Sequence, residues 1–172
     1  MDFYDDLEMS SVLTNRETRL AIRTANSIML TKYVENWKSV INEMPKLRTY
    51  KTLKSSFGTE PYVKSNISRK ARSVLAKLRN GSFPINIELG RYRGLPLERR
   101  ICPLCKEGVE DELHFLCVCP TYQESRTLLY NKLDLNDSSD EERLIILLSD
   151  GQNAKYTAKF VIKAYEMRSG RG

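Results

Sequence analysis

Apolar residues recur at helical spacing along most of the chain, which predicts a mainly α-helical fold with little or no sheet. Residues 14–44 carry the longest such pattern, with a predicted break near residues 24–27 and an end at Pro45. Its apolar positions are expected to face a core: Leu20, Ile22, Ala25, Met29, Tyr33, Trp37, Val40, Ile41 and Met44. Trp37 lies on this stripe and is therefore predicted to be a core residue.

Shorter helices are predicted in the remainder of the chain. Residues 68–80 form one, because Ser68 is a favourable N-cap and Gly81 a favourable stop. Three more helices are predicted. The first spans residues 120–134, the second begins at a cap, Ser138 or Ser139, and ends at Gly151, and the third spans residues 153–167. Residues 82–96 contain two prolines, and the apolar alternation at residues 85–89 predicts one short strand or an extended arm.

All four cysteines and the single histidine fall within residues 102–119. Cys102 and Cys105 are separated by two residues, and His114 and Cys119 follow after a short loop containing Gly108, which is expected to adopt a turn conformation. This is the spacing of a zinc knuckle, in which Zn²⁺ takes four nitrogen or sulfur donors in a tetrahedron. His114 and Cys119 are expected to lie on one helix face, about one to one and a half turns apart.

Five candidate donors compete for four places around the ion. Cys119 is the preferred fourth ligand, and Cys117 is the alternative, otherwise a small buried apolar residue. Disulfides are the competing interpretation of the cluster. They belong to oxidising compartments, whereas residues 1–10 are acidic and do not resemble a secretory leader. We therefore expect bound zinc and an intracellular location, either nuclear or cytoplasmic.

The predicted architecture is a small helical domain with an embedded CCHC zinc knuckle. Residues 1–45 form an N-terminal helical segment, and residues 46–120 form a basic helix and arm that lead into the knuckle at residues 101–120. Residues 121–172 supply C-terminal helices that pack on the same core.

Positive charge is concentrated in the middle of the chain. The whole chain has a net charge of +6, but residues 46–106 alone carry 15 Lys or Arg and 3 acids, a net +12. Both ends are mildly acidic. Such a distribution favours an anionic partner for the middle segment, and the partner can be either RNA or DNA. The residues expected to contact nucleic acid are Arg69, Lys70, Arg72, Lys77, Arg79, Arg91, Tyr92, Arg93, Arg99 and Arg100.

Other function classes find little support. No apolar run approaches the roughly 20 residues of a membrane helix, so no membrane partner is expected. Four protein donors close a zinc site to water, and no carboxylate pattern of a polymerase or nuclease is visible, so no catalysis and no small-molecule substrate are expected. Glu110, Asp111 and Glu112 are interpreted as acids at the N-terminus of the His114 helix. The alternative to nucleic-acid binding is a zinc-stapled protein-interaction or scaffold domain.

The motifs resemble one family. The segments that carry the likeness are Arg100-Ile-Cys-Pro-Leu-Cys105, Val109-Glu-Asp-Glu-Leu-His114-Phe-Leu, Cys119-Pro120, and Tyr122, Arg126 and Leu129. Together with the upstream Leu75, Leu78-Arg-Asn-Gly81 and Glu88-Leu-Gly-Arg-Tyr92, they resemble the zinc-binding module that follows the reverse transcriptase of non-LTR (LINE-like) retrotransposons.

The resemblance covers residues 69–133 and implies that Cys102, Cys105, His114 and Cys119 bind zinc while the module binds element RNA or target DNA. It also implies a partner, a reverse transcriptase polypeptide. The chain itself shows no polymerase motif, so the likeness suggests a separated C-terminal fragment, a degraded copy or a domesticated descendant.

Overall fold

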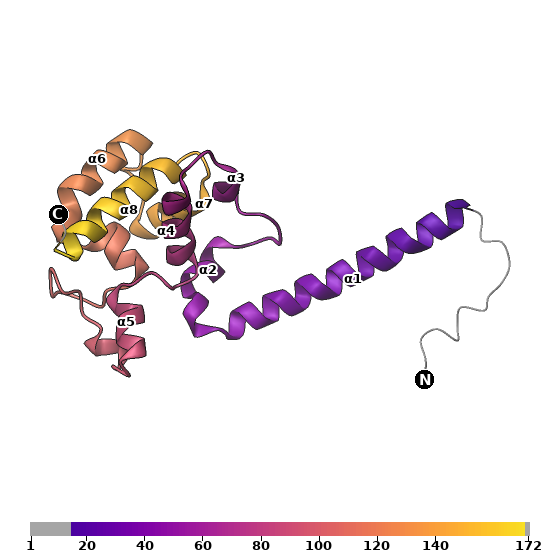
Figure 1. The fold of residues 1–172 in the computed structure, drawn as a ribbon, viewed down its shortest axis with the longest axis horizontal. Helices are drawn as coiled ribbons and strands as arrows, with labels where there is room; N and C mark the ends of the chain where they lie inside the picture. Colours follow the sequence, from indigo (N-terminus) through magenta and orange to yellow (C-terminus); the bar gives the residue numbers. More distant parts are fainter. Residues whose placement is uncertain (1–14, 171–172) are drawn as a thin grey trace. The chain divides into compact units, whose positions relative to one another are not determined.

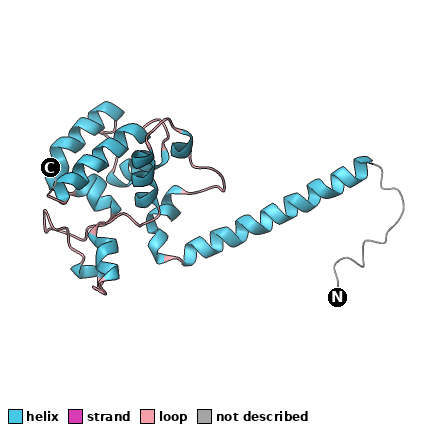
Figure 2. Ribbon diagram, viewed as in Figure 1, coloured by secondary structure: helices cyan, strands magenta, loops and turns pink. Residues whose placement is uncertain are grey.

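The structure is a computed structural model that describes residues 15–170 (Figure 1). The chain divides into two units, Met1–Glu43 and Met44–Gly172. The described residues are mainly helical and contain no sheet, as predicted (Figure 2). Their only paired extended residues are Ile101 and Val109, which form one antiparallel bridge. None of the described helices combines the length and apolar character of a membrane span.

The first unit is described by one helix, α1 (Asn15–Glu43). It ends before Pro45 as predicted, but it is continuous through residues 24–27, because Thr, Asn and Ser weaken a helix without the backbone clash that proline causes. The expectation of a buried stripe is wrong: Leu20 and Met29 are exposed, and Trp37 is only half-buried. Apolar residues are spread around this helix, so they do not define one buried face.

The second unit consists of short helices joined by turns and loops. Their bounds are η2 (Pro45–Leu47), α2 (Arg48–Leu53), α3 (Pro61–Lys64), α4 (Arg69–Arg79), α5 (Asn86–Tyr92), η3 (Leu97–Arg99), η4 (His114–Val118), η5 (Pro120–Tyr122), α6 (Gln123–Leu133), α7 (Asp140–Ser149) and α8 (Ala154–Arg168). Within this unit α8 packs against α4, α6 and α7, as Figure 1 shows. Its Val161 is fully buried in a core that includes Leu78 of α4 and Leu147 of α7.

Local signals set several helix ends as predicted. The Ser68 hydroxyl accepts a hydrogen bond from the Ala71 N–H at the start of α4. Gly81 follows α4 with φ +67°, and a Cβ there would clash with the Lys46 carbonyl oxygen, so a larger residue is excluded. Ser139, one of the two predicted caps, forms a capping box with Glu142 at the start of α7.

The segment expected to be a short strand or an extended arm is instead helix α5. The Asn86 N–H donates to the Glu110 carboxylate at 2.7 Å, and the Ile87 N–H donates to the Glu110 carbonyl at 2.9 Å. Glu110, a distant residue, therefore accepts hydrogen bonds from free N–H groups in the first turn of α5. These bonds stabilise a helix here, although the local apolar alternation favours a strand.

Candidate metal centre

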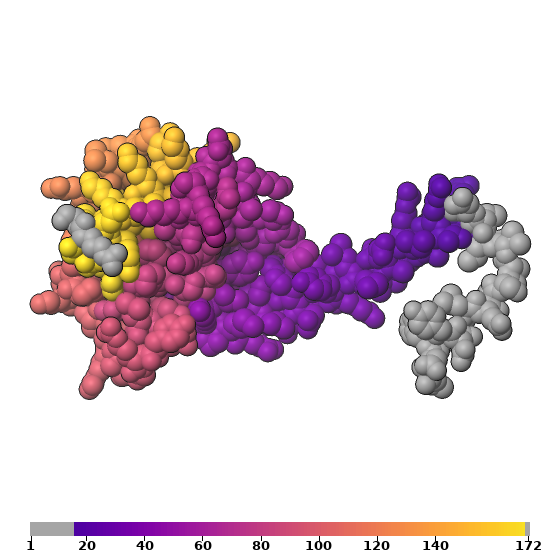
Figure 3. All heavy atoms as spheres, in the orientation of Figure 1, coloured from indigo at the N-terminus to yellow at the C-terminus, as the bar shows by residue number. Residues whose placement is uncertain are grey.

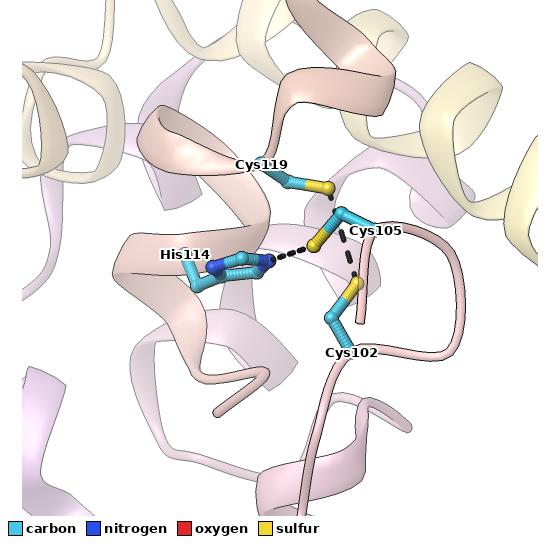
Figure 4. A group of neighbouring side chains, drawn as sticks. All are labelled: Cys102, Cys105, His114 and Cys119. Atoms are coloured by element: carbon cyan, nitrogen blue, oxygen red, sulfur yellow. Dashed lines mark hydrogen bonds between the residues drawn. The ribbon is translucent and has the colours of Figure 1, made fainter. Parts of the chain in front are cut away.

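Three cysteines and the histidine of the second unit converge on one point (Figure 4). The Sγ atoms of Cys102, Cys105 and Cys119 and a ring nitrogen of His114 all lie within 4.8 Å of one another. Cys102 Sγ is 3.9 Å from Cys119 Sγ, and Cys105 Sγ is 3.3 Å from His114 Nε2. All four cysteines are free thiols, so the disulfide interpretation does not apply. These donor atoms form a group that could hold a metal ion.

Cys102 and Cys105 are placed by a tight hairpin. The Ile101–Val109 bridge closes its base, and the Cys102 N–H donates to the Gly108 carbonyl at 2.8 Å. The Lys106 N–H turns back to the Cys102 carbonyl at 3.1 Å. The residue with positive φ is Lys106, at 61°, and not Gly108 as expected. The reversal occurs immediately after the second cysteine, which directs both thiols to the same side.

His114 and Cys119 are placed by the π-helix η4. In an α-helix, five residues turn through about 500°, which leaves the second side chain about 140° away from the first. The Cys119 N–H instead donates to the His114 carbonyl at 2.8 Å, five residues earlier. This wider turn returns Cys119 to the side of His114, so the local helix type makes the predicted His-x4-Cys spacing workable.

Arg126 holds the end of this π-turn. Its side chain is fully buried, and its Nε donates to the Leu116 carbonyl at 2.9 Å while Nη2 donates to the Cys119 carbonyl at 2.6 Å. Nη1 donates to Gln123 Oε1 at 3.0 Å. Sequence reasoning gave Arg126 no role. The available signal was a lone cation three residues before Leu129 on the buried side of a predicted helix.

Cys117 lies outside the cluster. It is buried, and the group of converging donors contains Cys119 instead. Burial raises the pKa of the Cys117 thiol to about 11. A protonated thiol in apolar surroundings behaves as a small apolar side chain.

Burial also controls protonation within the cluster. It raises the pKa of the Cys102 thiol to about 12, because a thiolate is poorly stabilised without water. It lowers the pKa of His114, with Asp111 opposing the shift, so the neutral ligating form of the imidazole is favoured. A bound cation reverses the first effect, since coordination deprotonates a thiol.

The three acids before His114 have different roles. Asp111 fits the prediction of a helix N-terminal acid, because its Oδ1 accepts the His114 N–H at 2.8 Å. Glu110 and Glu112 do not fit it, because both carboxylates are buried and paired with distant cations. Glu110 binds Arg168 at the end of α8 at 2.6 Å, and Glu112 binds Arg48 at the start of α2 at 2.7 Å. They connect the metal-site loop to two helices.

Two of the predicted nucleic-acid contacts serve the fold instead. Arg79 is buried between Glu60 and the Leu148 carbonyl, so its guanidinium is not at the surface. Arg100 is half-buried, with its guanidinium donating to the Leu95 carbonyl at 2.9 and 3.0 Å and to the Ile87 carbonyl at 3.0 Å. Both were expected to face solvent because charged residues usually do.

The other predicted contacts are wholly or partly exposed. Arg72 is half-buried and donates to the Ile67 carbonyl at 3.3 Å. The exposed members on α4 are Arg69, Lys70 and Lys77, and those on or near α5 and η3 are Arg91, Tyr92, Arg93 and Arg99.

α5 packs against η3, so its exposed residues and Arg99 belong to one part of the second unit. Tyr92 is 71% exposed. The Arg91 guanidinium lies 4.4 Å from the centre of the Tyr92 ring and is also ion-paired with Glu88. We refer to Arg91, Tyr92, Arg93 and Arg99 as the arginine surface.

Comparison of the chain with protein-family models, curated proteins and solved structures gives no match.

Proposed function

We propose that Cys102, Cys105, His114 and Cys119 bind one structural Zn²⁺ ion. The observation that carries this proposal is the convergence of three thiols and one imidazole within 4.8 Å. For tetrahedral zinc, bond lengths of about 2.0–2.3 Å imply ligand separations of roughly 3.5–3.8 Å. One S–S separation, 3.9 Å between Cys102 and Cys119, and one S–N separation, 3.3 Å between Cys105 and His114, are close to these values. Sulfur-rich tetrahedral sites favour zinc among the common divalent ions.

Zinc at this site has a structural role in our proposal. Four protein donors fill a tetrahedron and leave no position for water or substrate, so the chain alone is not expected to be an enzyme. The ion would join the hairpin of Cys102 and Cys105 to the π-turn of His114 and Cys119. Because a site of this kind is not formed in an unfolded chain, binding energy becomes folding energy.

We further propose that the zinc-stabilised unit binds RNA or DNA through the arginine surface. Three exposed arginines supply cations for phosphates, and the exposed ring of Tyr92 supplies a face on which a base can stack. The exposed cations of α4 extend the same type of surface chemistry. Arg100 supports the proposal indirectly, because its hydrogen bonds to Leu95 and Ile87 connect the segment bearing these residues to the start of the hairpin.

The resemblance to the zinc module of LINE-like retrotransposons agrees with this proposal. It suggests element RNA or target DNA as ligand and a reverse transcriptase polypeptide as partner. That relationship stays a prediction from the motifs.

The test reverses the charges of the arginine surface in the triple variant R91E, R93E and R99E. Fluorescence anisotropy with a labelled single-stranded RNA and a labelled DNA duplex is expected to show a loss of affinity of at least tenfold at about 50 mM salt. Wild-type affinity should fall steeply between about 50 and 200 mM salt, because phosphate contacts release counterions. The matched control is K155E, K159E and K163E, which changes charge equally on α8.

Unchanged binding by a folded triple arginine variant would contradict the nucleic-acid proposal. Weak, salt-insensitive binding by the wild type would do the same. Either result would favour the alternative, a zinc-stapled protein-interaction or scaffold domain without nucleic-acid binding.

A further inference from the structure

An open groove lies between the start of α4 and the helices α6 and α8. Its volume is about 780 Å³ and its lining is mainly apolar. Figure 3 shows the side chains of α8, in yellow, at the surface between those of α4 and α6. Leu128 of α6 lines the groove and is 71% exposed, and Tyr156 of α8 is also exposed. Exposed apolar residues on protein surfaces are usually scattered singly, whereas Leu128 and Tyr156 contribute to one concave surface.

Four lysines line the groove together with these apolar residues. Lys155, Lys159 and Lys163 recur every four residues, which places them on one side of α8. Lys132 comes from α6, and its ammonium lies 4.7 Å from the centre of the Tyr156 ring. No acidic side chain is among the described residues that line the groove. The described residues of the groove therefore combine an apolar floor with positive charges and no negative ones.

We propose that this groove binds an acidic, amphipathic helical segment of a partner protein. Such a segment presents apolar side chains at helical spacing to the floor, and its carboxylates meet the lysines. The charge pattern selects an acidic partner over a basic or neutral one. The volume is within the range of roughly 300–1,000 Å³ that ligand sites occupy, so several apolar side chains can enter.

The small exposed aromatic area of its floor distinguishes this groove from the arginine surface. Single-stranded nucleic acids use cations together with aromatic faces, on which bases stack. Here the most exposed floor residue is Leu128, which offers no such face, while Phe160 is buried and Tyr156 is 38% exposed, against 71% for Tyr92. The proposal therefore assigns a second, protein-binding surface, and it does not depend on whether the arginine surface binds nucleic acid.

The experiment uses a labelled helical peptide of about 16 residues, with Leu and Phe at positions i, i+3, i+4 and i+7 and Glu elsewhere. One control peptide has every Glu replaced by Lys, and another has every Leu and Phe replaced by Ser. Both should bind at least tenfold more weakly to the wild-type chain. If the controls bind as well as the acidic amphipathic peptide, the proposal is wrong.

The groove is tested with two variants of the full chain. K155E, K159E and K163E removes the cations, and L128S removes exposed apolar surface without emptying a core. Each is expected to weaken peptide binding about tenfold, since both electrostatic and apolar contacts contribute. The matched control, R91E, R93E and R99E, should leave peptide binding unchanged. Circular dichroism verifies that each variant is folded.

The same variants separate this inference from the proposed function. Loss of RNA or DNA binding in the lysine variant, with no peptide binding by the wild type, would show that the groove is part of the nucleic-acid surface and would overturn the inference. Peptide binding that depends on the lysines supports the inference. This holds even if the arginine variant binds nucleic acid as well as the wild type, a result that would contradict the proposed function.

Discussion

Replacing Arg126 with methionine should weaken both the fold and the metal site. The guanidinium is fully buried and donates to the carbonyls of Leu116 and Cys119 and to the amide oxygen of Gln123. Methionine retains much of the aliphatic volume and donates none of these bonds. The Cys119 carbonyl loses its 2.6 Å bond from Arg126 and keeps the longer 3.3 Å bond from the Tyr122 N–H, so the backbone beside a proposed zinc ligand is less firmly held.

The cost can be worked from the bonds that are lost. Leaving the buried Leu116 carbonyl without this donor costs about 1–3 kcal/mol, and losing the charged hydrogen bond to the Cys119 carbonyl costs about 1.5–3 kcal/mol more. Metal affinity should also fall by about 10–100-fold, the usual effect of removing a group that orients a ligand. The positive charge of Arg126 also favours zinc binding. Zn²⁺ with three thiolates and a neutral imidazole carries one net negative charge, which a buried cation nearby stabilises.

Two assays measure these effects separately. Urea unfolding of the zinc-loaded chain, followed by circular dichroism, gives the free energy of unfolding. Competition with a chromophoric chelator gives the zinc affinity. The matched control is Arg143→Met: Arg143 donates to the carbonyls of Leu135 and Asn136 and to Asp140, none of which is a proposed ligand. R143M should lower stability while leaving zinc affinity within about twofold of wild type.

Zinc affinity that is unchanged in R126M would refute the claim that this arginine supports the metal site. An equal loss of affinity in R126M and R143M would refute it as well, because the effect would then reflect general destabilisation.

Two further predictions concern α5, the helix that precedes the hairpin. Gly90→Ala should destabilise the chain by about 1–3 kcal/mol in urea unfolding, because the new Cβ would lie 2.6 Å from Cγ of Arg100, which three hydrogen bonds hold in place. Adding Arg100→Ala should make that substitution nearly neutral, and full additivity would contradict the proposed clash. The hydrogen bond from Arg91 lowers the pKa of Glu88 from 4.5 to about 2. The ionised Glu88 carboxylate therefore stabilises the folded chain above pH 4.5, and this stabilisation is lost as the pH falls toward 2. Glu88→Gln should remove roughly 1 kcal/mol at neutral pH and flatten the acid limb of the stability curve, and an unchanged acid limb would exclude this role.

Helices with strong local signals could be predicted from the sequence. Ser68 and Gly81 bracket α4, and Ser139 with Glu142 begins α7, because caps act within a few residues of the helix end. The donor residues of the metal site were also recognisable, since all lie within one short stretch. Local spacing could not decide between Cys117 and Cys119, because the answer depends on the π-turn that brings Cys119 over His114.

Features that depend on distant partners could not be predicted. α5 forms because Glu110, 24 residues after Asn86, accepts its first N–H. Arg79 is buried because Glu60 and the Leu148 carbonyl receive its guanidinium. In a sequence such a cation looks the same as a solvated one, and only packing distinguishes them.

α1 shows the opposite limitation. Its apolar residues suggested a buried face, but they are spread around the helix, and Leu20 and Met29 are exposed.

The most direct test is the metal content of the purified chain, measured by elemental analysis and native mass spectrometry. We expect one zinc per chain, retained in Cys117→Ala, lost or strongly weakened in Cys119→Ala, and followed by unfolding when a chelator removes it. A wild-type chain that is fully folded without metal would contradict the central claim. A chain that loses zinc in C117A and keeps it in C119A would contradict the assignment of the fourth ligand.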